Sequence, residues 1–145
     1  MDDVEMVAIE SRAREFRAAL EVCDPRLLTV CLEEFPHGAC GDASLLLAEY
    51  LHECGLGPFD YVCGEKCDGN DDFQSHAWLQ KGDVIVDITA DQFEGAPGSV
   101  IVTRSLDFHR QFEVENRHSA ELRHYDERTQ RVMSRAYKHV RALIA

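Results

Sequence analysis

The sequence predicts an α+β fold, with N-terminal helices packed on a small, mostly antiparallel sheet and a further helix at the C-terminus. Apolar residues recur at helical spacing up to about residue 54, and short alternating segments fill about 59–103. Helical spacing returns after about residue 126. Helices first and strands afterwards are typical of α+β proteins. At 145 residues, we expect one domain over 1–145.

The first part of the chain predicts two helices before a break. The apolar residues of a helix over about 4–22 share one face, and three arginines are expected to point away from it: Arg12, Arg14 and Arg17. Asp24 and Pro25 are suited to cap and begin a second, shorter helix that reaches Cys31.

A third helix is expected from about Cys40 to Cys54. Pro36 and Gly38 interrupt the chain before it, and Gly55 is suited to end it in a left-handed conformation. The apolar residues between these limits fall on one side of the helix, which we expect to be buried.

The middle of the chain predicts four strands, namely Phe59–Gly64, Phe73–Leu79, Val84–Thr89 and Val100–Thr103. An acidic loop over Glu65–Asp72 separates the first two. The segment 105–125 has no clear period, and the last helix is expected from about residue 126.

The charge excludes some classes of partner. Twenty-seven acidic against fifteen basic side chains give a formal net charge of −12, which repels nucleic acids and anionic membranes and suits a basic partner. The chain shows no signal peptide and no apolar run of membrane-spanning length, so we expect a cytoplasmic protein. In that compartment the six cysteines should be reduced, and Cys31 and Cys54 are expected as core residues.

Cys40 is the candidate nucleophile. It follows the turn-forming residues Pro36 and Gly38 and begins the third predicted helix. A helix N-terminus and a nearby histidine both favour the thiolate, which is the attacking species. The backbone N–H of Cys40 has no partner within a helix and is suited to bind an oxyanion. We expect the carboxylate of Asp42 to face the backbone or a neighbouring side chain rather than the sulfur.

His76 and Asp87 are the candidate base and orienting acid. They lie on two strands joined by a tight turn near Gly82. With Lys81 and Gly82 at the turn, His76 lies directly opposite Asp87, with Cβ atoms about 5 Å apart. With Gly82 and Asp83 at the turn, Asp87 becomes a diagonal neighbour on the same face. In both registers the carboxylate is suited to hold one imidazole nitrogen and leave the other for a thiol.

Trp78 is expected on the same face as His76, opposite Ile85, either as a cover that keeps water from the base or as an ordinary core residue. Four other histidines lie in polar contexts and are expected at the surface: His109, His118, His124 and His139.

The motifs follow one another in a particular order over residues 35–93. Gly38-x-Cys40 begins a helix, Val62-Cys63-Gly64 ends a strand, and His76-Ala77-Trp78 precedes Val86-Asp87-Ile88-Thr89. This set resembles the transglutaminase-like core of the papain-like cysteine superfamily, in a small, bacterial-type member. The resemblance implies that Cys40 is the nucleophile, His76 the base and Asp87 the residue that orients it.

The resemblance also implies cysteine-dependent hydrolysis or acyl transfer at an amide of a peptide or protein, of the protease, deamidase or transglutaminase type, with no cofactor. Papain-like enzymes place a glutamine upstream of the cysteine as an oxyanion donor. The match by spacing is Glu34, which cannot donate when ionised. His37, Gly38 or another loop amide is therefore expected to supply the second donor, and Trp78 to border the substrate.

Two other functions fit the same residues. The fold could serve as a non-catalytic, acidic adaptor or inhibitor-like protein that binds a basic partner. It could also be an acyltransferase that uses a thioester donor, since the same triad order serves acyl transfer to amines. The sequence indicates no oligomeric state.

Metal binding is the rival chemistry. Cys63 and Cys67, with His76 or His37, offer zinc-type ligands, but no second pair of ligands follows them. A Cys63–Cys67 bridge is an alternative under oxidation. The acidic run Asp68–Asp72 offers oxygen ligands without the spacing of an EF-hand loop. We expect no bound metal.

Overall fold

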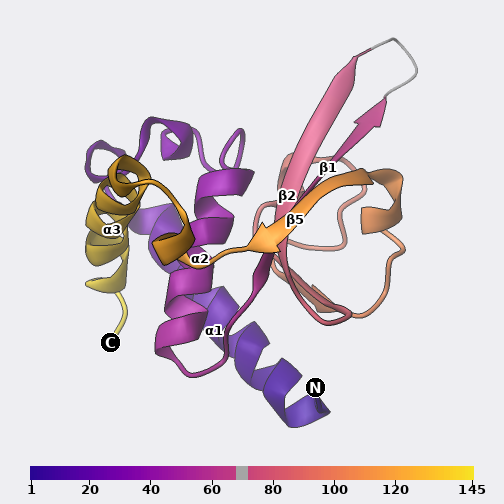
Figure 1. Ribbon diagram of the computed structural model, residues 1–145, viewed down its shortest axis with the longest axis horizontal. Helices are drawn as coiled ribbons and strands as arrows, with labels where there is room; N and C mark the ends of the chain where they lie inside the picture. The colour runs from indigo at the N-terminus through magenta and orange to yellow at the C-terminus, as the bar shows by residue number, and fades with distance from the viewer. Residues whose placement is uncertain (68–71) are drawn as a thin grey trace.

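The computed structural model describes residues 1–67 and 72–145, which form helices and one antiparallel sheet (Figure 1). The α-helices are α1 (Asp3–Val22), α2 (Cys40–Glu53) and α3 (Glu127–Arg141). The strands are β1 (Asp60–Cys67), β2 (Phe73–Lys81), β3 (Val84–Asp87), β4 (Ile101–Thr103) and β5 (Glu113–Ser119). Their order in the sheet is β4-β3-β2-β1-β5, with every neighbouring pair antiparallel. The predicted α+β class with an antiparallel sheet is confirmed.

The helices gather on one side of the sheet (Figure 1). Leu79, Val84 and Val86 belong to the same buried cluster as the helical residues. Trp78 and Ile85, which alternate with them along the strands, form a second cluster with Val62 and Phe112. Because successive side chains of a strand point to opposite faces, the sheet has a helical face and a second, aromatic-rich face.

Helix α2 lies against the sheet and begins at Cys40, as expected. Its apolar side is fully buried, and Gly55 follows its end with a φ of +77°, which confirms the predicted left-handed ending. Among the helices of the described residues, none has both the length and the apolar content that a bilayer crossing requires.

The second predicted helix is wrong in type, and the first predicted strand ends too early. The short second helix is replaced by two 3-10 turns, Pro25–Leu27 and Val30–Leu32, because the backbone is extended at Leu28 and Thr29 between them. Strand β1 continues to Cys67, so the acidic loop starts later than predicted. Its paired strand β2 supplies the backbone partners that extend it.

The unassigned segment 105–125 contains β5 and short 3-10 turns. Six of the seven residues of β5 are exposed, so the strand has no alternation of apolar and polar side chains. Backbone pairing with β1 defines the strand, and only the tertiary structure shows that pairing.

The β2–β3 hairpin takes the second of the two registers considered. Leu79 pairs with Val86 and Lys81 with Val84, so Gly82 and Asp83 form the turn. Gly82 has the expected positive φ, +60°. Lys81 belongs to the strand, and its Nζ donates to a carboxylate of α1 and to a loop carbonyl, Glu5 Oε1 at 2.8 Å and Leu56 O at 2.9 Å. The first of those registers, with His76 directly opposite Asp87, is wrong, because the turn lies one residue further along the chain.

Arg17 does not point to solvent as predicted, because it is buried at 7% exposure. Its guanidinium binds both carboxylate oxygens of Asp91, at 2.7 and 2.8 Å, and donates to the carbonyl of Ile88 at 2.7 Å. A second carboxylate, Glu21, accepts from its Nε at 2.7 Å. Arg17 thereby fixes the segment that directly follows β3 to helix α1.

Replacement of Arg17 by lysine should lower the free energy of unfolding by about 2 kcal/mol, because lysine cannot make the forked, two-oxygen contact with Asp91. Urea unfolding followed by circular dichroism measures this change. The matched control is Arg14→Lys on the exposed side of the same helix, where the ion pair with Glu10 is solvated. We expect that control to stay within about 0.5 kcal/mol. Equal effects of the two substitutions would contradict the anchoring role of Arg17.

Candidate active site

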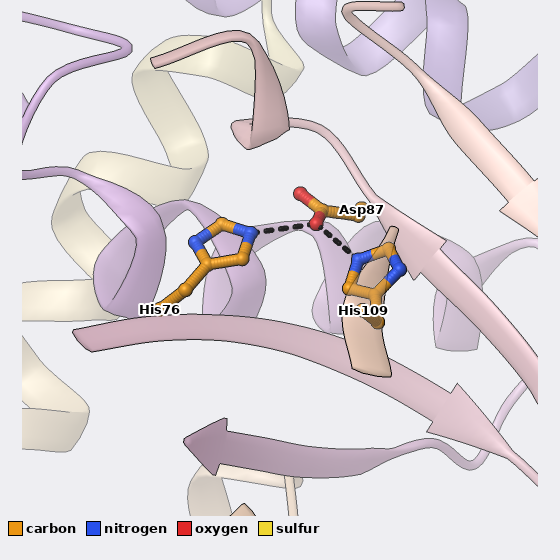
Figure 2. A group of neighbouring side chains, drawn as sticks. All are labelled: His76, Asp87 and His109. Atoms are coloured by element: carbon orange, nitrogen blue, oxygen red, sulfur yellow. Dashed lines mark hydrogen bonds and ion pairs between the residues drawn. The ribbon is translucent and has the colours of Figure 1, made fainter. Parts of the chain in front are cut away.

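Three buried side chains meet on the aromatic-rich face of the sheet (Figure 2). Nε2 of His76 lies 2.6 Å from Oδ2 of Asp87, and Nε2 of His109 lies 2.7 Å from the same oxygen. The three residues are 0, 1 and 2% exposed for His76, Asp87 and His109. One carboxylate oxygen therefore binds two imidazole rings out of contact with water.

Each member comes from a different element. His76 lies on β2, Asp87 is the last residue of β3, and His109 begins the 3-10 turn His109–Gln111 between β4 and β5. The other carboxylate oxygen of Asp87, Oδ1, accepts the backbone N–H of Thr89 at 3.0 Å. Continuation of the hairpin register makes Asp87 a diagonal neighbour of His76, on the same face.

The charges of this group follow from burial and hydrogen bonding. Burial of Asp87 opposes ionisation, but hydrogen bonds from His109 and His76 outweigh it and lower the pKa of the carboxyl to about 2. Burial of His76 opposes the imidazolium, but the interactions with Asp87 and Cys40 outweigh it and raise the pKa of the ring to about 9. At neutral pH the pair is therefore a carboxylate and an imidazolium.

Cys40 lies at the half-buried start of α2, and its thiol contributes to the raised pKa of His76. Nε2 of His76 is bound to Asp87, so this interaction falls to Nδ1. Nδ1 itself is buried and makes no well-aligned hydrogen bond with the described residues. The structure thus brings together the three residues predicted as nucleophile, base and orienting acid.

The start of α2 leaves backbone donors free next to Cys40. Ala39 occupies the N-cap position and makes no side-chain hydrogen bond to the helix. The first N–H groups of a helix have no partner within it, so those of the first turn are available to an anion. Tyr61 of β1 lies over this turn, since a Cβ built on Gly41 would be 3.2 Å from the Tyr61 hydroxyl.

Aromatic rings surround the imidazole of His76. Ring centroids lie 5.0 Å from it for Phe93, 5.2 Å for Phe112 and 5.7 Å for Trp78. Trp78 is thus beside the base and buried, as expected, but Ile85 pairs with Gln80 rather than with Trp78. The rings keep water from the His76–Asp87 contact.

The remaining predicted residues lie around the start of α2. Gly38 adopts a positive φ of +68° in the turn before the helix, and His37 beside it is exposed. The carboxylate of Asp42 accepts a hydrogen bond from the hydroxyl of Thr29 at 2.5 Å, which confirms that it binds a neighbouring side chain. Glu34 is exposed in the same turn as His37.

The metal alternatives built on Cys63 and Cys67 are contradicted by geometry. The two residues lie four apart on strand β1, about 13 Å along it, too far for a disulfide or a shared ion. Both are free thiols, as are the other cysteines. Residues 68–71 of the acidic run Asp68–Asp72 lie outside the described residues.

Two residues of the site were missed by sequence reasoning. His109 was expected at the surface but is buried against Asp87. The aromatic residues Phe108 and Phe112 on either side of it, in an otherwise polar segment, were the available signal. Tyr61 had no signal of its own, because its position over Gly41 depends on how β1 packs against α2.

A scan against protein-family models and searches of curated proteins and of solved structures find no match to this chain. The assignment of function therefore depends on the geometry of the site itself.

The coupled pair of His76 and Asp87 predicts how stability depends on pH. The raised pKa of His76 makes a contribution that is complete below pH 6.5 and is lost as the pH rises towards 9. The lowered pKa of Asp87 makes a second contribution to stability, which is complete above pH 3.8 and is lost as the pH falls towards 2. The joint contribution should be largest between these limits.

Urea unfolding of the protein and of a His76→Gln variant between pH 5.5 and 9 measures this effect. Relative to the variant, the unsubstituted protein should lose on the order of 3 kcal/mol across the alkaline range. Groups that titrate in both proteins cancel in the difference. Parallel pH curves for the two proteins would contradict a charged His76–Asp87 pair.

Proposed function

We propose that the protein is a cysteine-dependent enzyme that hydrolyses an amide of a peptide or protein, or transfers its acyl group to an amine. The observation that carries this proposal is the arrangement of Cys40 at an uncapped helix start, beside an imidazole whose other nitrogen is bound to a buried carboxylate. A thiol beside a base whose other nitrogen is bound to an orienting carboxylate is the signature of covalent catalysis.

The hydrogen bond to Asp87 determines which nitrogen of His76 acts as the base. Asp87 is ionised and can only accept, so Nε2 of His76 must carry a proton. In the imidazolium, Nδ1 holds the proton that the Cys40 thiol has given up, so the sulfur attacks the carbonyl carbon as a thiolate. As the tetrahedral intermediate collapses, Nδ1–H returns its proton to the leaving amine and a thioester remains on Cys40. Water or a second amine then releases the acyl group.

The oxyanion of the intermediate would lie at the start of α2. The N–H of Cys40 is one donor, since it precedes the first helical hydrogen bond, which Ala43 donates to Ala39. We assign the second to the hydroxyl of Tyr61, which lies over the same turn at Gly41. Burial raises the pKa of this phenol, and Cys63 and Cys40 add to the effect, so it stays a donor at neutral pH.

The charge and burial of the site indicate the kind of substrate. The half-buried Cys40 is the accessible member of the triad, while His76 and Asp87 are enclosed. The net charge of −12 favours a peptide or protein with basic residues near the reacting amide. Enclosure of the base protects its proton from exchange with water during the reaction.

Replacement of Cys40 by alanine should abolish the fast phase of acylation by p-nitrophenyl acetate, because the rapidly formed thioester is on that sulfur. The burst of p-nitrophenolate and the mass of the acetylated protein measure the reaction. Cys54→Ala is the matched control, since Cys54 is a free, half-buried thiol at the other end of the same helix. We expect it to retain the full burst, and both variants should keep the circular dichroism spectrum.

Equal acetylation of the Cys40→Ala variant would contradict the proposal. The same conclusion would follow if Cys40 of the unsubstituted protein were acetylated no faster than Cys54, since a non-catalytic binding protein needs no activated thiol.

Replacement of Tyr61 by phenylalanine should slow acylation by p-nitrophenyl acetate by on the order of 100-fold, as expected for the loss of one oxyanion donor. Alkylation of Cys40 by iodoacetamide displaces iodide and forms no oxyanion, so its rate should stay within about twofold. A parallel fall in both rates would show that Tyr61 acts on the thiol rather than on the intermediate.

A further inference from the structure

His109 has no step in the mechanism above, yet it is as deeply enclosed as the residues that have one. Its Nε2 lies 2.7 Å from Oδ2 of Asp87, and its Nδ1 is buried without a partner among the described residues. Its ring lies nearly parallel to that of His76, with centroids 6.2 Å apart and planes at 17°, and its centroid is 4.7 Å from that of Trp78. A buried polar group without a partner is costly, which calls for a compensating role.

The geometry fixes the proton on His109. The ionised carboxylate of Asp87 cannot donate, so a contact of 2.7 Å requires a proton on Nε2 of His109. A second proton on Nδ1 would leave a buried N–H without an acceptor. The ring therefore donates to Asp87 through Nε2 rather than through Nδ1.

We propose that His109 is a positioning residue for the Cys40–His76 pair: its Nε2–H keeps Asp87 ionised and oriented towards His76. This inference rests on the proposed function of that pair. Without the second donor, the enclosed carboxylate would have His76 and the N–H of Thr89 as its partners. The proton of the imidazolium could then move to the carboxylate, and His76 would lose the charge that stabilises the thiolate.

The charged surroundings agree with this role. Burial of Asp87 opposes ionisation, and the hydrogen bond from His109 is one of the two that outweigh it. On the aromatic side, Nζ of Lys66 lies over the rings of Phe93 and Phe112, 5.0 and 5.5 Å from their centroids. On the other side, Asp107 and Glu10 border a surface cavity with His109 and add no positive charge. His109 and His76 are thus the donors to Oδ2 of Asp87.

A metal ion held by His76, Asp87 and His109 is the competing interpretation, since their ligand atoms lie within 4.8 Å of one another. Zinc bound to two such atoms at usual lengths holds them about 3.3 Å apart at a tetrahedral angle. The contacts of 2.6 and 2.7 Å are shorter and match charged hydrogen bonds. We therefore favour the hydrogen-bonded arrangement, and a zinc-binding measurement tests the metal site.

Two variants distinguish the effect of the hydrogen-bond donor of His109 from the effect of its aromatic ring. His109→Gln places an amide N–H near the position of Nε2 and keeps a donor without a titrating ring. His109→Phe keeps an aromatic ring among aromatic neighbours and removes the donor.

The readout is the rate of Cys40 alkylation by iodoacetamide between pH 5 and 9, measured by mass spectrometry of the Cys40 peptide. We expect the Phe variant to be slower by at least about tenfold at pH 7, with its profile displaced to higher pH. The Gln variant should stay within about threefold.

Equal profiles for the Phe variant and the unsubstituted protein would overturn the inference, as would equal losses in both variants. Proton and nitrogen NMR of the unsubstituted protein gives a test that needs no folded variant. We expect downfield N–H protons on Nε2 of both His76 and His109, and a proton on Nδ1 of His109 instead would overturn the inference. Stoichiometric zinc binding that both variants abolish would also overturn it, in favour of a metal centre.

Failure of the proposed function gives a different result. If Cys40 of the unsubstituted protein reacts no faster than Cys54 at pH 7, the enzyme proposal fails. If Cys40 is activated but the Phe variant is unchanged, the role of His109 alone fails.

Discussion

The candidate site depends on one interaction, the acceptance of two imidazole N–H groups by a single buried carboxylate oxygen of Asp87. A carboxylate at 1% exposure is costly unless charged partners and hydrogen bonds compensate for the lost water. Here His76 supplies the opposite charge, His109 a second donor, and the N–H of Thr89 a third. The tautomer of His76, and with it the nitrogen that is free for Cys40, follows from this contact.

The rest of the fold keeps that contact in place. The β2–β3 hairpin sets His76 and Asp87 on one face, and the 3-10 turn at His109 brings the second ring from a different part of the chain. Arg17 fixes the segment after Asp87 to α1 through Asp91 and the carbonyl of Ile88. Rigid elements around a site limit the movement of its side chains, which is a condition for fixed proton donors and acceptors.

The sequence predicts the parts of the site that lie in regular elements with a buried side. Alternation along two short strands is enough to place His76 and Asp87 on one face, since either turn position keeps them there. It is not enough to choose the register, because Gly82 suits both turns and the ion pair between Lys81 and Glu5 lies outside the hairpin. The start of α2 at Cys40 follows from the preceding glycine and the apolar helical period.

The rest of the site depends on tertiary contacts that leave little trace in the local pattern. His109 comes from a segment whose strand is almost wholly exposed, so no periodicity marks its burial. Tyr61 lies over Gly41 because of the packing between a strand and a helix that are separated in sequence. Arg17 is a charged residue on an amphipathic helix, and its buried partners 71 and 74 residues later are not visible in that helix.

These separations along the chain have a consequence for the order of folding. Arg17 meets Ile88 and Asp91 after 71 and 74 residues, and His109 meets Asp87 after 22. Because loop closure costs entropy, we expect such contacts to form once the sheet and the helices are already joined. The imidazolium beside Cys40 therefore exists in the completed fold and not in an unfinished chain. The proposed activation of the Cys40 thiol would therefore be absent from a growing or partly unfolded copy and would arise together with the native state.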